Sequence, residues 1–217
     1  AWHNLGYSML GSGAFQRHAE AYERAMAPLA DGHLTVTKAM KDFLQQDMMI
    51  SEEPNMNVLY DCPPEMFQPL SFREQHEVLA KLDAQLCKAC PRSWYTSRPE
   101  GAVNAHTLLT EHFGKDRYEP RRNRPALVTS STSWTPDEDF GILLAALVLL
   151  DKRIREQESN LTVLVIVTGK GPQKALYQEK MSQLPLQHVA IQTVWLEPAD
   201  YPKLLACADM GVSLHTS

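Results

Sequence analysis

The sequence predicts an α/β protein whose strands form parallel sheets. The last third of the chain alternates apolar strand patterns with helical patterns, and this alternation is typical of βαβ units. The run LTVLVIV at 161–167 is apolar without interruption, which indicates a strand buried on both faces of a sheet. The first third holds a shorter mixture of the same patterns, so we expect two α/β units.

In the first third, apolar residues at helical spacing predict a helix over 18–29. HLTVT at 33–37 and MNVLY at 56–60 have the character of short strands. Thr37 can cap a helix that follows the first of them. These elements form the first unit, which we expect to be incomplete at its start.

The middle of the chain begins with a helix signal and then loses its pattern. Ser71 and Glu74 have capping-box spacing and predict a helix that starts between them. From 87 to 124, prolines, glycines and arginines interrupt every period. We interpret this stretch as a linker or a surface insertion.

The last third forms the second unit, incomplete at its end. Strands are expected at 126–130, 161–167, 189–196 and 210–214, and helices at 137–155, 173–184 and 201–208. Thr135 and Glu138 have capping-box spacing, with Pro136 at the first helical position. Ligands of such sheets bind beyond the carboxyl ends of the strands, so the loops there are the candidate sites.

Composition excludes several classes of protein. With 217 residues, 44% of them hydrophobic, the chain is long enough to bury a core and is not disordered. Its net charge of −5 argues against nucleic acid as the partner. The longest apolar run, 142–150, is far shorter than the roughly 20 residues of a membrane span. Both ends look cut, so we expect a piece of a longer protein.

Four cysteines do not make a disulfide framework. Cys87 and Cys90 form a CxxC pair, but no second pair completes a zinc site. We therefore expect no metal and no redox function. The sequon at Asn160 abuts a buried strand, and we do not expect it to be glycosylated.

The first candidate loop, Ser131, Thr132 and Ser133, offers hydroxyl donors just before a helix, where phosphates bind well. The acidic residues at 137–139 have a simpler reading, since carboxylates stabilise a helix N-terminus. The loop is therefore either a phosphate cradle or a helix cap.

The second candidate loop is Gly169, Lys170 and Gly171, between a buried strand and a helix. Glycines allow the backbone to approach a ligand closely, and Lys170 adds a positive charge. The loop matches neither the Walker nor the dinucleotide pattern. Plain turn chemistry explains it equally well.

Two further segments carry polar and aromatic groups. Trp195, Glu197, Asp200 and Tyr201 follow a strand and could hold a base or a ribose; alternatively, Asp200 caps the next helix and the rings pack. His3 lies in a polar, aromatic segment and could act as an acid, a base or a sugar-binding group, or could simply be exposed.

Four stretches resemble one family: WHNLGYSML at 2–10, STSWTPDEDFGILLAAL at 131–147, VTGKGP at 167–172 and VWLEPADYPKLLACADMGVSLHTS at 194–217. They are similar to the chitobiosyldiphosphodolichol β-mannosyltransferases. The resemblance covers roughly 1–67 and 125–217, and it is poor between them.

The resemblance implies the GT-B fold, two Rossmann-like domains with parallel sheets, here truncated at both ends. Residues 1–67 would be the C-terminal part of the acceptor-side domain. Residues 68–124 would be a helix plus an irregular insertion or linker. Residues 125–217 would be the first part of the donor-nucleotide domain.

The family transfers mannose from GDP-mannose to dolichol-diphosphate-linked chitobiose with inversion, which implies a β-1,4 linkage and no metal cofactor. Ser131, Thr132, Ser133, Gly169, Lys170 and Gly171 would then bind the donor phosphates. Trp195, Glu197, Asp200 and Tyr201 would flank the nucleoside, and His3 would lie in the active site.

The resemblance further implies the cytosolic face of the endoplasmic reticulum membrane, attachment through segments outside this chain, and other glycosyltransferases of that membrane as candidate partners. The family continues after HTS with residues that should complete the donor site, so we expect these 217 residues alone to be inactive. Two alternatives remain. One is a GT-B glycosyltransferase with another donor or acceptor, and the other is a non-catalytic scaffold relative.

Overall fold

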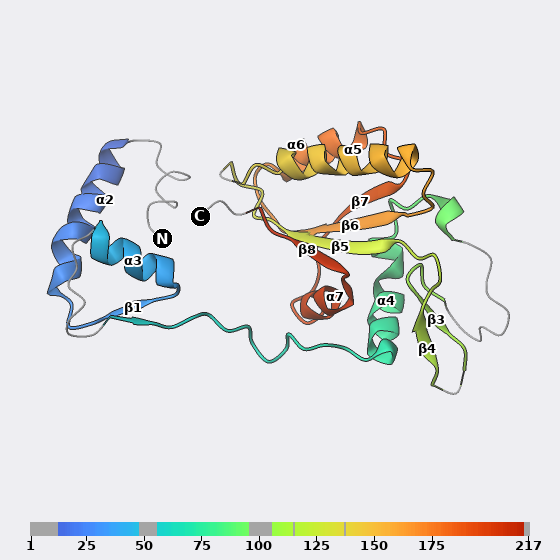
Figure 1. Cartoon of the computed structure of the whole chain (residues 1–217), viewed down its shortest axis with the longest axis horizontal. Coiled ribbons are helices and arrows are strands. Elements are labelled where there is room, and N and C mark those ends of the chain that lie inside the picture. The colour runs from blue at the N-terminus through green and yellow to red at the C-terminus, as the bar shows by residue number, and fades with distance from the viewer. Residues whose placement is uncertain (1–12, 48–55, 96–105, 115, 137, 215–217) are drawn as a thin grey trace. The chain divides into compact units, whose positions relative to one another are not determined.

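The computed structural model describes residues 13–47, 56–95, 106–114, 116–136 and 138–214. The chain divides into two compact units, 1–64 and 65–217 (Figure 1). The boundary follows Pro64, and the second unit includes the stretch 68–124 that separates the two matched regions.

The first unit contains a helix–strand–helix–strand order. Its elements are α2 (Gly13–Met26), the 3-10 helix η1 (Ala27–Leu29), β1 (His33–Thr35), α3 (Lys38–Gln46) and β2 (Met56–Val58). β1 and β2 pair in parallel, as predicted. The Thr37 hydroxyl accepts the N–H of Met40 at 3.1 Å, which confirms the predicted cap of α3.

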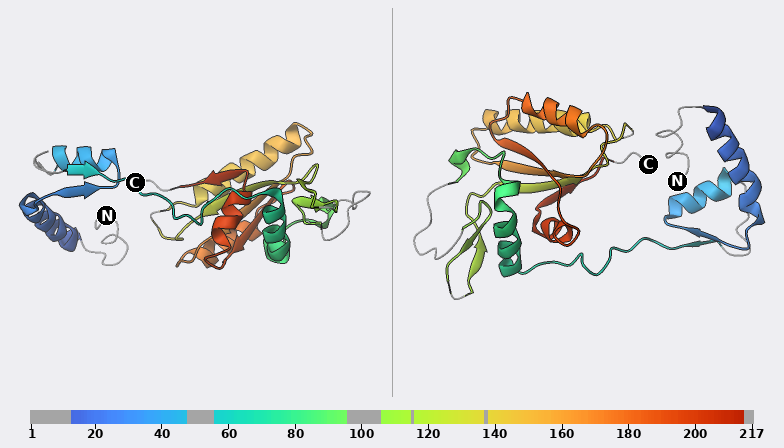
Figure 2. Two further views of the ribbon diagram at one scale, coloured as in Figure 1. Left: turned by 90° about the horizontal axis from the view of Figure 1, so that it is seen from below. Right: turned by 180° about the vertical axis from the view of Figure 1, so that it is seen from behind.

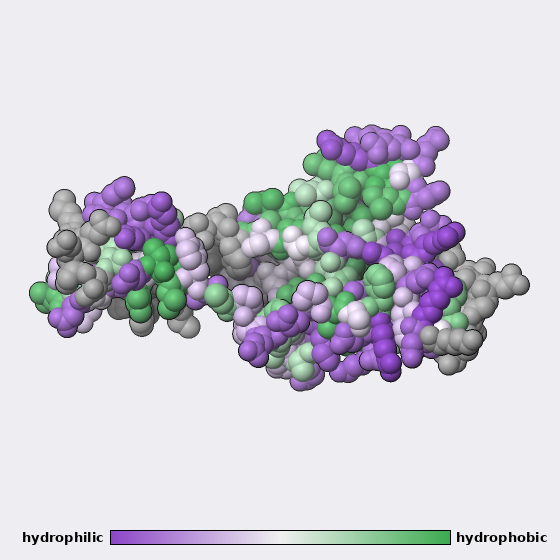
Figure 3. All heavy atoms as spheres, turned by 60° about the horizontal axis from the view of Figure 1, so that its bottom comes forward, coloured by the Kyte–Doolittle hydropathy of each residue, from purple (hydrophilic) through white to green (hydrophobic). Residues whose placement is uncertain are grey.

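Apolar side chains of the first unit are largely exposed. Of its described residues, Met56 is the buried hydrophobic one, packed against Ala27 and Leu44. Leu29 and Leu34 are 74% and 73% exposed, and apolar residues are visible on the surface of this unit in Figure 3. The described part of this unit therefore encloses very little core.

The second unit is built on a four-stranded sheet in the order β7-β6-β5-β8, with every pairing parallel. Its elements are α4 (Phe72–Leu86), η2 (Arg92–Trp94), β3 (Thr110–His112), β4 (Tyr118–Pro120), β5 (Ala126–Ser131), α5 (Gly141–Glu156), β6 (Val163–Thr168), α6 (Lys174–Ser182), β7 (Val189–Val194), α7 (Tyr201–Cys207) and β8 (Met210–Val212). The predicted α/β class with parallel sheets is confirmed.

Alternating residues of β6 serve two separate cores. Leu164 and Ile166 pack with α4 and α7, whereas Val163, Val165 and Val167 pack with α5 and α6. Figures 1 and 2 show these helix pairs on opposite faces of the sheet. The continuous apolar run of β6 follows directly from this two-sided burial.

The described parts of 68–124 include a helix, a 3-10 turn and a hairpin, and α4 packs on one face of this sheet. The capping box of α4 is confirmed, because Ser71 and Glu74 exchange side-chain and backbone hydrogen bonds. Leu82 and Leu86 are buried in the core beneath the sheet. The segment after α4 includes the antiparallel hairpin β3–β4, whose strands are too short to show a period in the sequence.

The start of α5 differs from the prediction. The helix begins at Gly141, not at Asp137, and Thr135 does not cap it. Glu138, the expected partner of Thr135, instead binds the loop before it, and the Asp139 carboxylate accepts the Gly141 N–H at 2.9 Å. Phe140, just before the helix, is buried against Trp134.

Candidate nucleotide-binding site

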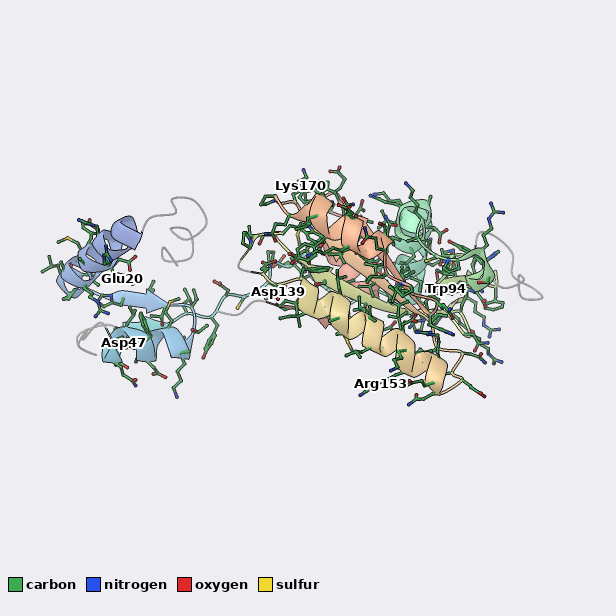
Figure 4. The ribbon with its side chains drawn as sticks, turned by 90° about the horizontal axis from the view of Figure 1, so that it is seen from above. Glu20, Asp47, Trp94, Asp139, Arg153 and Lys170 are labelled. Carbon is green, nitrogen blue, oxygen red and sulfur yellow. The ribbon has the colours of Figure 1, made fainter. Side chains whose placement is uncertain are left out.

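A pocket of about 480 Å³ opens at the carboxyl ends of β5, β6 and β7. Its walls are Ser131, Thr132, Ser133, Glu138, Thr168, Gly169, Trp195, Leu196, Pro198 and Tyr201. The structure thus brings together three loops that are up to 70 residues apart in sequence. Figure 4 shows Lys170 and Asp139 at this end of the second unit, with Arg153 at the far end of α5.

A chain of hydroxyl groups joins the three loops. Ser131 Oγ lies 3.0 Å from Thr168 Oγ1 and 2.7 Å from the Tyr201 hydroxyl. These contacts connect the ends of β5 and β6 to the first residue of α7. Polar contacts therefore connect the loops that form the pocket, whose shape does not depend on apolar packing alone.

Glu138 is a buried carboxylate in the pocket wall, 5% exposed. It accepts hydrogen bonds from the Thr132 hydroxyl, from the Ser133 hydroxyl at 2.8 Å and from the Ser133 N–H at 3.1 Å. The donors of Thr132 and Ser133 are thus directed to Glu138. The predicted phosphate contacts of these residues stay a prediction, and the visible role of the loop is to shape the pocket.

The two glycines of the second loop lie against the first loop. Gly169 has φ +134°, and a Cβ there would lie 1.8 Å from the Thr132 carbonyl oxygen. A Cβ on Gly171 would lie 1.7 Å from the Ser133 carbonyl oxygen. Both positions therefore require glycine for loop-to-loop packing, whatever ligand the loop binds.

Trp134 completes this contact between the loops. It is 1% exposed, has φ +52°, and packs against Phe140 and Tyr177. Its indole Nε1 has no hydrogen-bond partner among the described residues. A buried donor and an αL backbone are costly, so the surrounding core must hold this loop firmly.

Lys170 and Trp195 form a cation–π pair next to the pocket. The Lys170 ammonium nitrogen lies 3.9 Å from the centroid of the Trp195 ring. Trp195 lines the pocket and is 52% exposed. The pair sets a positive charge and an aromatic surface side by side at the strand ends, which suits a nucleotide.

Asp200 and Glu197 do not contribute to the pocket wall described above. Asp200 is 5% exposed, and its two carboxylate oxygens accept from the Lys81 ammonium at 2.7 and 2.8 Å. Glu197 is exposed, and its backbone carbonyl accepts the Asp200 N–H. Asp200 lies just before α7, but its side chain makes no capping hydrogen bond, so the alternative reading as a helix cap is wrong, whereas the nucleoside contacts expected of Asp200 and Glu197 stay predictions. The Asp200 carboxylate pairs with Lys81 and does not bind the N-terminus of α7.

His3 lies outside the described residues, so its predicted active-site role stays a prediction. Within the described residues, His, Cys, Asp and Glu side chains do not gather in groups of three that could hold a metal ion. The thiol of Cys87 has a raised pKa, through its hydrogen bond with Cys90 and through burial. A raised pKa disfavours the thiolate that metals and redox reactions need.

Four further residues that line the pocket lie within the candidate loops but were not predicted as ligand contacts: Glu138, Thr168, Leu196 and Pro198. Thr168 had a usable signal, since it ends a buried strand directly before the glycine loop. Glu138 was hidden by its capping-box spacing, which predicted a helix start in place of a pocket wall.

Relatives of known name match the whole chain. "UDP-glycosyltransferase TURAN" of Arabidopsis thaliana is 42% identical over 235 residues, covering 100% of this chain and 50% of that protein. "Chitobiosyldiphosphodolichol beta-mannosyltransferase" of Homo sapiens is 37% identical over 222 residues, covering 100% and 46%. The protein of that name from Dictyostelium discoideum is 37% identical over 237 residues, covering 100% and 45%.

The chain is a homologue of these glycosyltransferases. Several of the relatives carry the β-mannosyltransferase name, which confirms the resemblance seen in the motifs. This homologue spans about half the length of the curated relatives it matches. No protein-family model matches it.

Two solved structures are similar to this chain, but less closely than the relatives above. The GtfA/B complex aligns with a TM-score of 0.41 at 16% identity, covering 80% of this chain and 24% of that one. The pneumococcal O-GlcNAc transferase GtfA aligns with a TM-score of 0.39 at 12% identity, covering 81% and 24%. Among the described residues, no helix combines the length and apolar character needed to cross a membrane.

Proposed function

We propose that the strand-end pocket binds the nucleoside diphosphate of a sugar donor, and that this donor is GDP-mannose. The observation that carries the proposal is the Lys170–Trp195 pair at the rim of a pocket formed by three loops. The choice of mannose as the sugar is supported by homology to proteins named β-mannosyltransferases. The proposed architecture is GT-B, with residues 125–217 as the start of the donor domain.

The proposed reaction is transfer of mannose to dolichol-diphosphate-linked chitobiose, with a β-1,4 linkage and inversion at the anomeric carbon. The acceptor is supported by the printed names of the relatives. In this reaction the acceptor hydroxyl oxygen bonds to the anomeric carbon of mannose and gives its proton to a base, while the bond from that carbon to the diphosphate breaks and GDP leaves. Negative charge grows on the diphosphate, and a cation beside it stabilises the transition state. The endoplasmic reticulum as the site of action belongs to the same proposal.

Within the pocket, we assign the phosphates to the side of Lys170 and the Gly169 loop. The hydroxyls of Thr132 and Ser133 already donate to Glu138, which is itself negative. An anion is therefore better placed next to Lys170 than next to Glu138. The exposed indole of Trp195 then offers the nucleoside an aromatic surface.

Lys170→Ala is expected to weaken binding of GDP about tenfold, as loss of one charge-assisted contact does. Titration calorimetry of GDP into the chain measures it. Lys180→Ala is the matched control, because Lys180 also lies over an aromatic ring, that of Tyr177 at 4.8 Å, but on α6 away from the pocket. Equal losses in both variants would count against the phosphate assignment.

A second candidate is a UDP-sugar donor, since the Arabidopsis relative is named a UDP-glycosyltransferase. Parallel titrations with GDP and UDP separate the two. The proposal requires tighter binding of GDP, and a clear preference for UDP would replace it with the second candidate.

Transfer can be tested in a hybrid, because the match covers only part of the relatives. These 217 residues would replace the corresponding region of the human relative. Transfer of mannose from GDP-mannose to lipid-linked chitobiose by the hybrid supports the proposal. A folded hybrid that binds GDP but transfers nothing points to another acceptor or to a scaffold role.

A further inference from the structure

The loop 195–200, which forms one wall of the pocket, is held from outside by helix α4. Lys81 of α4 donates to both carboxylate oxygens of Asp200, and Gln85 donates from Nε2 to the Trp195 carbonyl at 3.1 Å. The two contacts attach the loop to α4 at its first residue, Trp195, and at its last, Asp200. α4 and α7 share one face of the sheet (Figure 1).

These contacts are unlike ordinary surface pairs. The Lys81 side chain is 62% exposed, but its partner Asp200 is only 8% exposed. A buried carboxylate that loses its partner is left with a large desolvation cost, so the loop has a strong reason to stay against α4. A neighbouring aromatic contact lies outside both α4 and the loop: Phe67, which precedes α4, meets Tyr201 of α7 edge to face at 6.2 Å. Tyr201 in turn contacts Ser131 in the pocket.

We propose that Lys81 and Gln85 are positioning residues for the nucleotide pocket, because they fix the loop that carries Trp195. This inference rests on the proposed function. Neither residue lines the pocket, and both act through the backbone and the carboxylate of the loop. The affinity of the pocket for a nucleotide is set in part by a helix that precedes the sheet by 40 residues of chain.

The test uses Lys81→Met, Gln85→Met and Lys81→Arg in the whole chain, with two readouts. The first is the affinity for GDP at a temperature where each variant is folded. The second is amide hydrogen exchange of residues 195–201 without nucleotide. Lys152→Met is the matched control: this lysine is 63% exposed and pairs with Glu156 on α5, away from the pocket.

We expect Lys81→Met to weaken GDP binding about tenfold and Gln85→Met about threefold, the sizes of lost charged and neutral contacts. Both variants should speed exchange in 195–201, and Lys81→Arg should restore most of both properties. Gln85→Met keeps the size and exposure of the side chain, so it tests the inference even if Lys81→Met fails to fold.

An unchanged affinity in the folded variants, or unchanged exchange in 195–201, would overturn the inference. A loss as large in Lys152→Met would do the same. If the wild-type chain binds neither GDP nor UDP, the proposed function fails. The exchange readout then decides by itself whether α4 fixes the loop.

Discussion

Gly171→Ala is expected to destabilise the second unit by at least about 3 kcal/mol, near the upper end for single substitutions. The new Cβ would lie 1.7 Å from the Ser133 carbonyl oxygen and 2.9 Å from Trp134 Cβ. Backbone atoms supply the closest contact, so no side-chain rotation relieves it. The loop 131–135 must move, and the pocket moves with it. Chemical denaturation followed by circular dichroism measures the loss.

Gly211→Ala is the matched control for this substitution. Gly211 lies in β8 of the same sheet, and a Cβ there meets nothing within 4 Å. The free energy of unfolding of the Gly211→Ala variant should differ from that of the wild type by no more than about 0.5 kcal/mol. If Gly171→Ala behaves like Gly211→Ala, the close packing of the two loops is incorrect.

Asp151→Ala is expected to cost about 3–5 kcal/mol, since it removes a buried charged acceptor. Asp151 is 1% exposed, and one of its oxygens accepts the N–H groups of Gln187, His188 and Val189 at 2.9, 2.7 and 3.2 Å. The other oxygen pairs with Arg155 at 3.0 Å. Removing the carboxylate leaves three backbone N–H donors at the start of β7 without an acceptor. Asp151→Asn keeps one acceptor oxygen and should lose less, as thermal unfolding would show.

The same carboxylate predicts a pH dependence. Burial raises the pKa of Asp151. The hydrogen bonds from the N–H groups of His188 and Gln187 and the charge of Arg155 lower it by more, so the net effect is a lowered pKa. The unfolded chain therefore takes up this proton more readily than the folded one. The stabilisation is complete above the unfolded pKa, about 3.9, and is lost as the pH falls through the folded pKa.

Asp151→Asn should consequently show a flatter acid limb than the wild type. The stability difference between the two proteins should stay constant above about pH 5 and shrink as the pH falls from about 4 through the folded pKa of Asp151. A constant difference across that range would show that Asp151 keeps an ordinary pKa in the folded protein.

The parallel sheet and its two covered faces were readable from the sequence because β6 is buried on both faces. Val163–Thr168 shows a run of apolar residues that only a central parallel strand requires. The rule that ligands bind at the carboxyl ends of strands placed the pocket correctly. Helix starts with a local hydrogen-bond signature, Thr37 and Ser71, were also predictable.

Contacts between distant segments were not readable. The glycines at 169 and 171 looked like ligand-approach glycines, yet a carbonyl group of the other loop occupies the space beside each of them. Asp200 looked like a cap or a nucleoside ligand, but Lys81, 119 residues earlier, binds it. Glu138 had the spacing of a helix cap, but its carboxylate accepts hydrogen bonds from the preceding hydroxyls of Thr132 and Ser133. The two cap readings failed because another partner outcompeted the helix N-terminus, Lys81 for Asp200 and the preceding hydroxyls for Glu138. The ligand contacts expected of the two glycines and of Asp200 stay predictions.

Direct titration of GDP into the chain tests the central claim, that the strand-end pocket binds a nucleoside diphosphate. The account predicts saturable binding at one site, tighter for GDP than for UDP, and weakened about tenfold by Lys170→Ala but not by Lys180→Ala. A folded chain that binds neither nucleotide, or binds one with no loss in Lys170→Ala, would contradict it.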